Sequence, residues 1–253
     1  MQLGFYVAGV SGSDVDRELS TLTNNIANAN TVGYKADRTS FATSLAKQIN
    51  GAAALSQGAP AFAGTGEQYV DLRTGALTAT GNPLDFGIRG DGYFRVRLPD
   101  GSEAYTRAGN FQMNAQGELT TADGKLVLND GGQPITLPRK GHISVDTDGT
   151  ITVHVRGRTT QTKVGKIGLA QIIDPRQVRK KAGVLLTTPP GNVKGADSSV
   201  KVMQGYTETS NVNSVQEMTQ LMSVQRNFDS MMKIVSQYSQ QMDLLNQQVG
   251  QIK

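Results

Sequence analysis

The last forty residues carry an apolar pattern that constrains the whole chain. From Leu221 onward, apolar residues recur at alternating spacings of three and four for about four heptads. This pattern predicts a helix from Ser214 to Lys253 with one narrow apolar face, which needs a partner to be stable. We call these positions the C-terminal stripe: Leu221, Val224, Phe228, Met231, Val235, Tyr238, Met242, Leu245 and Val249.

A matching pattern lies at the other end of the chain. Residues 3–30 predict a second helix, weakened at Gly9–Gly12 because glycine has low helix propensity, and ending within Asn28–Gly33. Its regular apolar positions, which we call the N-terminal stripe, are Val15, Leu19, Leu22 and Ile26. We expect the two helices to pair as a coiled coil, with the rest of the chain inserted between them. The alternative is that the last helix is a core helix of one domain.

The middle of the chain predicts strands. Residues 34–49 carry a loose helical pattern, and residues 50–66 are rich in Ala, Gly and Ser, as in a flexible or extended connector. Beyond Leu84, short alternating segments predict antiparallel strands, with the ends near Asn82 and Gly205 close together. The predicted strands are Phe86–Ile88, Tyr93–Leu98, Leu126–Leu128, Ile143–Val145, Ile151–Val155 and Val164–Ile173.

Five Asp-Gly pairs punctuate this region: Asp91-Gly92, Asp100-Gly101, Asp123-Gly124, Asp130-Gly131 and Asp148-Gly149. Asp-Gly favours hairpins because both residues accept positive φ.

The predicted fold class is therefore α+β, with an antiparallel all-β domain inserted into a coiled-coil domain. We expect residues 1–35 to form the N-terminal helix of the coiled-coil domain and residues 207–253 its C-terminal helix. Residues 36–80 form a connector, part helical and part extended, and residues 81–206 form the β domain.

The sequence carries no enzyme signature. Cysteine is absent, which excludes disulfides, thiol catalysis and zinc–thiolate sites. His142 and His154 are the only histidines, both in strand patterns without a third such ligand nearby, so a structural role is favoured over a metal or a catalytic base. Asp146–Gly149 is similar to the start of a calcium loop, but Val155 stands where the closing Glu should be. We therefore expect no catalytic, metal-binding or cofactor-binding residues.

Basic residues gather in one segment. Residues 139–181 hold ten Lys or Arg and three Asp, whereas the whole chain is only +4. Such a run is usually a solvated loop; the alternative is a patch facing an anionic polymer, either nucleic acid or a component of the cell envelope. Aromatic residues for base stacking are missing there, which lowers the nucleic-acid alternative.

Four ordered sequence blocks resemble those of the bacterial flagellar rod and hook proteins. They are Asn24–Lys35 (NNIANANTVGYK), Gly90–Phe94 (GDGYF), Tyr105–Phe111 (YTRAGNF) with Gly117–Leu119, and Glu208–Asn213 (ETSNVN) with Gln225–Phe228 (QRNF) in the last helix. The family-motif residues carried over are Asn24, Asn25, Ala27, Asn28, Gly33, Tyr34, Lys35, Ser210, Asn211, Val212 and Asn213.

The resemblance implies a structural role and a location. A chain of this size is similar to a rod protein with one β domain, and Tyr6–Ala8 with Ala36-Asp37 favours the proximal over the distal rod type. The family implies a helical tube that transmits torque across the periplasm and encloses the export channel. Its partners would be copies of itself, other rod proteins and possibly the surrounding rings and cell wall, with no nucleic acid and no membrane insertion. The two stripes would be the assembly interface, and export would need no cleaved signal peptide. A basic adaptor for an anionic polymer is the less favoured alternative.

Overall fold

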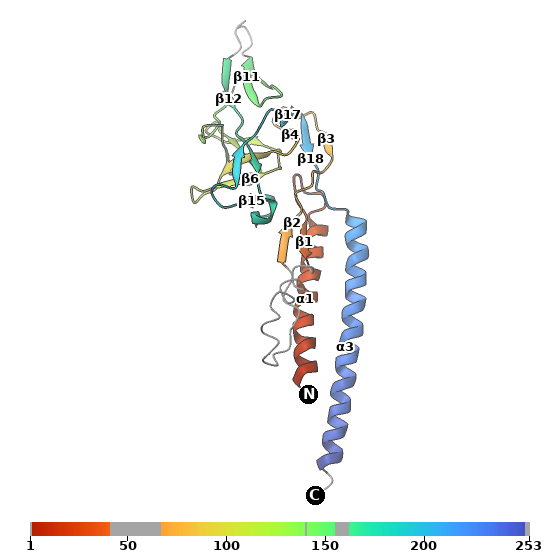
Figure 1. Cartoon of the computed structure of the whole chain (residues 1–253). Helices are drawn as coiled ribbons and strands as arrows, with labels where there is room; N and C mark the ends of the chain where they lie inside the picture. Colours follow the sequence, from red (N-terminus) through yellow and green to blue (C-terminus); the bar gives the residue numbers. More distant parts are fainter. Residues whose placement is uncertain (1, 41–66, 140, 155–161, 251–253) are drawn as a thin grey trace. The chain divides into compact units, whose positions relative to one another are not determined.

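The computed structural model describes residues 2–40, 67–139, 141–154 and 162–250 (Figure 1). These residues fall into two compact units. The helical unit comprises the described residues of 1–27, 37–68 and 213–253, and the β unit comprises residues 28–36 and those of 69–212. In the described part of the chain, no helix combines the length and apolarity that a membrane span needs.

Two long helices dominate the helical unit. Helix α1 spans Gln2–Ala27 and helix α3 spans Ser214–Gly250. The predicted weak point at Gly9–Gly12 does not interrupt α1, since a glycine costs only about 1 kcal/mol relative to alanine in a helix. The predicted end within Asn28–Gly33 is confirmed, and Gly33 there has a φ of +68°.

The two helices contact each other. Leu22 of α1 and Val224 of α3 are buried. Beside them, the Gln220 amide donates a hydrogen bond to Glu18 Oε1 at 3.3 Å. Half-buried positions are Val15, Leu19, Ile26, Leu221, Phe228 and Val235. The side chains of Met231, Tyr238, Met242, Leu245 and Val249 lie outside the described residues, although their backbone belongs to α3.

A short strand follows the first helix. Strand β1 spans Asp37–Ser40 and pairs with strand β2, Glu67–Val70. The helical pattern expected over residues 34–49 is therefore wrong for residues 37–40, and residues 41–49 lie outside the described part. The physical reason is a contact with the end of α1. The Asp37 N–H donates a hydrogen bond to Asn25 Oδ1, and Asn25 Nδ2 donates one to the Asp37 carbonyl, each at 2.9 Å.

The β unit is built from antiparallel pairs of short strands. Its strands are β3 Leu77–Ala79, β4 Phe86–Arg89, β5 Tyr93–Arg97, β6 Glu103–Thr106, β7 Gln112–Met113, β8 Leu119–Thr120, β9 Leu126–Val127, β10 His142–Val145, β11 Thr150–His154, β12 Thr162–Lys166, β13 Leu169–Ile172, β14 Arg179–Ala182, β15 Leu185–Thr187, β16 Val193–Gly195, β17 Lys201–Gln204 and β18 Tyr206–Glu208. One 3₁₀ turn, Pro175–Gln177, precedes β14.

The largest sheet has the order β14-β15-β6-β5-β9-β8-β7, with β13 also pairing β5 and β16. Strands β10, β11 and β12 form a separate three-stranded sheet. The predicted strand Val164–Ile173 is two strands, because at Gly168 the chain passes so close to Asn129 that a Cβ would lie 2.6 Å from the Asn129 carbonyl oxygen. The expected closeness of the domain ends is confirmed, since the Gly205 carbonyl accepts hydrogen bonds from the Thr80 and Gly81 N–H groups.

Four of the five Asp-Gly pairs lie in turns that return the chain antiparallel. Gly101, Gly124 and Gly149 have positive φ, and in the fourth turn the positive φ falls on Gly132. No described residue other than glycine has positive φ, so in these turns glycine alone takes the left-handed conformation. Asp91-Gly92 is not a hairpin, because β4 pairs with β17 and not with β5.

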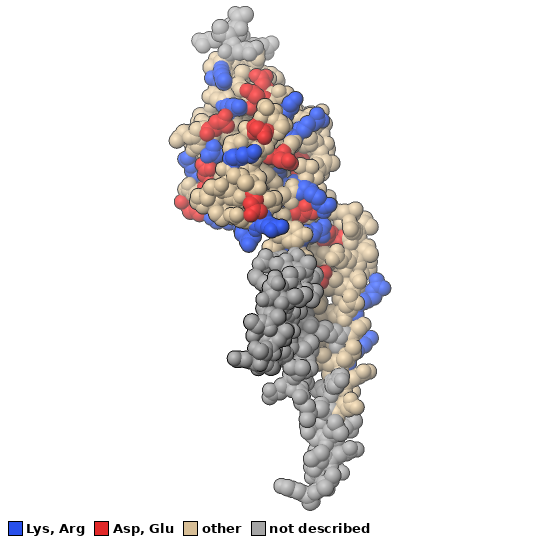
Figure 2. Space-filling model, viewed as in Figure 1, with Lys and Arg blue, Asp and Glu red and all other residues tan. Residues whose placement is uncertain are grey.

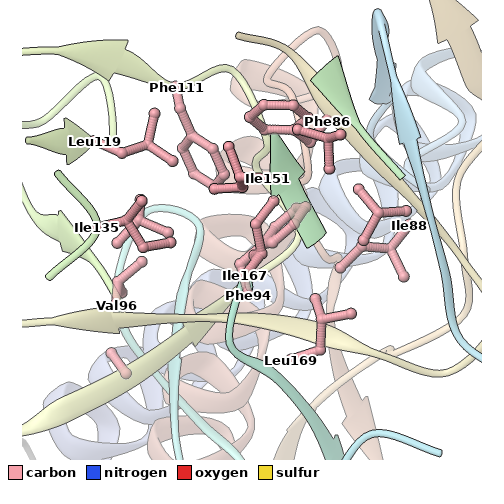
Figure 3. Packing of buried hydrophobic residues seen from close by; sticks show 14 of the residues in the cluster. Phe86, Ile88, Phe94, Val96, Phe111, Leu119, Ile135, Ile151, Ile167 and Leu169 are labelled. Atoms are coloured by element: carbon pink, nitrogen blue, oxygen red, sulfur yellow. The ribbon is translucent and has the colours of Figure 1, made fainter. Parts of the chain in front are cut away.

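The main core of the β unit lies among these sheets (Figure 3). Phe94 and Phe111 meet edge to face with ring centroids 5.0 Å apart, and Phe86 lies 6.0 Å from Phe111. Ile151 and Ile167 bring the three-stranded sheet and the chain after it into the same cluster. Removing apolar area from water contributes about 25 cal/mol per Å², so the packing of these buried side chains stabilises the β unit.

We expect acid to weaken the β unit through its turn aspartates. The pKa of Asp148 is lowered because its carboxylate accepts hydrogen bonds from the Thr150 N–H and hydroxyl, both at 2.9 Å. The Arg176 N–H lowers the pKa of Asp174, and the Ser199 hydroxyl and N–H lower the pKa of Asp197. A lowered folded-state pKa gives stability that is present above the unfolded pKa of about 3.9 and lost as the pH falls further.

Urea unfolding at pH 7, 5 and 3 measures this loss. Asp148→Asn keeps an oxygen acceptor for Thr150 but removes the titrating group, so its stability should fall less between pH 5 and pH 3 than that of the wild-type chain. An equal fall in both proteins would contradict the assignment.

Candidate functional site

The β unit contains a buried charge cluster centred on Glu208, at the end of β18. The Glu208 carboxylate accepts hydrogen bonds from Lys35 Nζ at 2.6 Å, Arg107 Nη1 at 2.8 Å and the Gly75 N–H at 2.9 Å. The side chains of Lys35, Arg107 and Glu208 are at most 2% exposed. Two cations therefore share one anion away from water. The stability of such an arrangement depends strongly on every partner being present.

The rest of the cluster is satisfied largely by backbone oxygens. Lys35 Nζ also donates to the Arg73 carbonyl at 2.7 Å, and Arg107 Nη2 donates to the Gly90 carbonyl at 2.6 Å. Burial lowers the pKa of Lys35, and Glu208 opposes that shift. The Arg107 guanidinium lies 4.9 Å from the centre of the Tyr93 ring, and burial raises the pKa of Tyr93 to about 12.

Hydrogen bonds from backbone N–H groups join residues 33–36 to the segment that begins at Glu208. The Gly33 N–H donates to the Glu208 carbonyl at 2.8 Å, and the Ala36 N–H donates to Asn211 Oδ1 at 2.8 Å. Asn211 Nδ2 donates in turn to the carbonyls of Asp71 and Arg73. One asparagine side chain thus ties together three segments that are far apart in the sequence.

Gly33 is required at its position by both conformation and space. Its φ of +68° lies in the left-handed region, and a Cβ there would stand 2.2 Å from the Ala108 backbone nitrogen. Gly124 is a matched control, because it has a φ of +79° with nothing within 4 Å of the added atom.

We expect Gly33→Ala to destabilise the β unit by several kcal/mol. Gly124→Ala should cost only about 1–2 kcal/mol, since it adds left-handed strain without a clash. Chemical denaturation of both variants measures the difference. Equal losses would show that the close approach of Gly33 to Ala108 does not constrain the fold.

The basic segment 139–181 also contacts the residues around Lys35. Lys180 Nζ donates to the Lys35 carbonyl at 2.7 Å and lies 3.9 Å from the centre of the Tyr34 ring. Lys181 pairs with Asp100 at 2.8 Å. Figure 2 shows acidic and basic side chains interspersed over the visible face of the β unit. Part of the basic segment 139–181 is therefore engaged within the chain.

A second buried polar cluster lies in the helical unit, between α1, β1 and the first turn of α3. Glu217 is 1% exposed and accepts hydrogen bonds from Arg38 Nη1 at 2.7 Å and Asn25 Nδ2 at 3.2 Å. Asn213 precedes α3 as its N-cap, with Oδ1 accepting from the Gln216 N–H at 3.3 Å. The Asn25–Glu217 hydrogen bond thus links the last turns of α1 to the first turn of α3.

Most of the family-motif residues therefore belong to one of two clusters. Gly33, Tyr34, Lys35 and Asn211 meet in the β unit, and Asn25 and Asn213 act in the helical unit. Ser210 Oγ accepts from the Val212 N–H at 3.2 Å, and Asn28 bonds to Thr31. Asn24 and Ala27 lie in the last turn of α1.

Sequence reasoning missed the charged centres of both clusters. Arg107 and Glu208 stand inside quoted blocks but were not identified as site residues, and Arg38 and Glu217 lie in none of them. The signal for Glu208 was its place at the start of a motif block. Its partner Lys35 is 173 residues away, so no local pattern could have paired them.

Comparison with known proteins identifies the family. Three family models match the chain in order: "Flagella basal body rod protein" over residues 6–35, "Flagellar hook protein FlgE/F/G D1 domain" over residues 87–153, and "Flagellar basal body rod FlgEFG protein C-terminal" over residues 203–248. Each of the first and last matches contains one of the stripes or most of it.

Individual relatives extend the match to nearly the full length. The flagellar basal-body rod protein FlgF of Mesorhizobium japonicum is 38% identical over 247 residues, which cover 96% of each chain. FlgF of Rhizobium meliloti is 37% identical over 91% of this chain and 90% of that protein. FlgG of Caulobacter vibrioides is 33% identical over 95% of this chain and 96% of that protein.

The chain belongs to the family of flagellar basal-body rod proteins. Within that family it is similar both to FlgF proteins, at 37–38% identity for the two above, and to FlgG proteins, at 33% for that of Caulobacter.

Proposed function

We propose that this chain is a structural subunit of the flagellar basal-body rod. The observation that carries the proposal is the match to rod proteins over nearly the whole chain, including both terminal helices. The relatives' names describe rod proteins, and we assign this chain no catalysis and no cofactor. In this role it polymerises with copies of itself and other rod proteins into a helical tube that transmits torque.

We further propose that α1 and α3 pair as a coiled coil that forms the assembly domain. Contacts between the helices, the burial of Leu22 and Val224, and the Asn25–Glu217 hydrogen bond support this pairing. The two stripes are the proposed assembly interface. The proposed division of the chain is residues 1–35 and 207–253 for the coiled-coil domain, 36–80 for the connector and 81–206 for the β domain.

The tube would enclose the export channel. The side of α3 away from the C-terminal stripe carries the uncharged amides of Gln237, Gln240 and Gln241, and all three side chains are exposed. An uncharged lining suits a channel that must not hold passing chains electrostatically. We place the subunit in the periplasmic part of the basal body, delivered by the flagellar type III export apparatus, with the surrounding rings and the cell wall as further neighbours.

Within the rod we favour the proximal position. Two FlgF proteins share 37% and 38% identity with the chain, whereas the FlgG protein of Caulobacter shares 33%. The distal rod is the alternative position. Genetic complementation distinguishes them: the gene should restore motility to a strain lacking FlgF and not to one lacking FlgG. Rescue of the FlgG-deficient strain alone would move the chain to the distal rod.

A basic adaptor for an anionic polymer is a weaker second candidate. Lys180 and Lys181 already bond within the chain, which reduces the charge available to such a ligand. Titration of the full chain with DNA at two salt concentrations separates the two functions. Tight, steeply salt-dependent binding would favour the adaptor.

Mass spectrometry of purified basal bodies tests the main proposal. Basal bodies stripped of hook and filament from the source bacterium should contain this chain in several copies per particle. A chain that is expressed but absent from intact basal bodies would remove the proposal.

A further inference from the structure

The two histidines of the chain stand opposite each other on neighbouring strands. Strands β10 and β11 pair antiparallel in a register that sets His142 against His154. Both side chains are exposed, whereas Val145 and Ile151 face the core from the same two strands. Since side chains alternate between the faces of a strand, the histidines share the outer face of the sheet with Ser144 and Thr152.

We propose that His142 and His154 form a two-histidine chelate for a divalent transition-metal ion. Directly opposed residues of an antiparallel pair have Cβ atoms about 4.5–5.5 Å apart. Imidazole nitrogens bind such metals at about 2.0–2.1 Å, so two rings leaning together from this spacing can share one ion. The proposal concerns the β unit alone and goes beyond the assembly role.

The hairpin holds the two ligands in place without the metal. Its turn is closed by hydrogen bonds from the Asp146 N–H to the Thr150 carbonyl and from the Gly149 N–H to the Asp146 carbonyl, both at 2.9 Å. Strand β11 also pairs with β12 on its other side, so a slip of the register would break two ladders. A site whose ligands are already fixed loses less entropy on binding.

The ligand set selects the kind of metal. Imidazole suits copper, nickel and zinc, and among divalent ions Cu²⁺ binds such sites most tightly, whereas Ca²⁺ and Mg²⁺ prefer oxygen ligands. The described residues include no cluster of three or more His, Cys, Asp or Glu, so water would complete the coordination. Among the described residues, Lys163 of β12 lies opposite Thr152, and its positive charge opposes cation binding.

Isothermal titration and electron paramagnetic resonance of the full, untagged chain test the site, with CuCl₂ and NiCl₂ as probes. We expect one strong Cu²⁺ site per chain, two nitrogen ligands in the Cu²⁺ spectrum, and weaker Ni²⁺ binding at the same place. His142→Gln and His154→Gln should each weaken Cu²⁺ binding about tenfold or more. Both residues are exposed, so neither variant should change the unfolding midpoint without metal.

The matched control is Lys163→Gln, which removes the neighbouring cation and should bind Cu²⁺ at least as tightly as the wild-type chain. Absence of a strong site would overturn the proposal. It would also fail if either His→Gln variant kept wild-type affinity, because the ion would then bind elsewhere or to one histidine only.

Discussion

Replacing Glu208 by Gln should lower the free energy of unfolding of the β unit by about 3–5 kcal/mol. The variant keeps the shape of the side chain but leaves Lys35 and Arg107 as buried cations without an anion. Removing one member of a buried ion pair is costly for this reason, even where the intact pair contributes little net stability. Urea unfolding followed by near-ultraviolet circular dichroism of the tyrosines measures the change.

A second Glu–Arg pair in the same unit provides the control. Glu103 binds Arg95 at 2.8 Å, but both side chains are partly exposed, at 36% and 23%. Glu103→Gln should therefore cost less than about 1 kcal/mol. Lys35→Met should cost less than Glu208→Gln, since the Arg107–Glu208 pair remains neutral. Similar losses for Glu208→Gln and Glu103→Gln would show that the buried cluster does not hold the β unit together.

Charges placed on the C-terminal stripe should abolish motility. Val224 is buried and Val235 is half-buried in the helical unit, so Val224→Asp with Val235→Asp puts two carboxylates against apolar surface. An unpaired charge in such surroundings costs several kcal/mol. We expect a strain carrying only this double variant not to swim in soft agar and to yield no complete rods.

The control for the stripe uses the neighbouring exposed serines. Ser223→Asp with Ser236→Asp adds the same two charges to α3 on its exposed side. This strain should swim, because exposed carboxylates stay in contact with water and leave the stripe unchanged. Motility of the Val224/Val235 variant at the wild-type level would show that the stripe is not needed for assembly.

The sequence predicted the elements whose pattern is local. The three-and-four spacing from Leu221 predicted α3, and the alternation at Tyr93–Leu98 predicted β5. The helical spacing of the residues that follow predicted a helix over residues 37–40. The hydrogen bonds between Asp37 and Asn25 favour a strand instead, and no spacing in the sequence reveals them. Likewise, Asp91-Gly92 looked like a hairpin because the pairing of β4 with β17, more than a hundred residues later, is nonlocal.

The candidate site shows the same limit. The motif residues could be named from the resemblance, but the chemistry that joins them could not. Lys35, Arg107 and Glu208 come from three distant parts of the chain, and each is unremarkable in its own segment. Only the fold shows that one carboxylate serves both cations, or that Lys180 of the basic segment lies against Tyr34.

A density map of the isolated rod tests the central claim most directly. Helical reconstruction of rods from the source bacterium should show a rod segment whose side-chain density fits this sequence, with Leu22 of α1 facing Val224 of α3 and the β unit continuing from them. A complete rod in which no segment fits this sequence would contradict the assignment of the chain as a rod subunit.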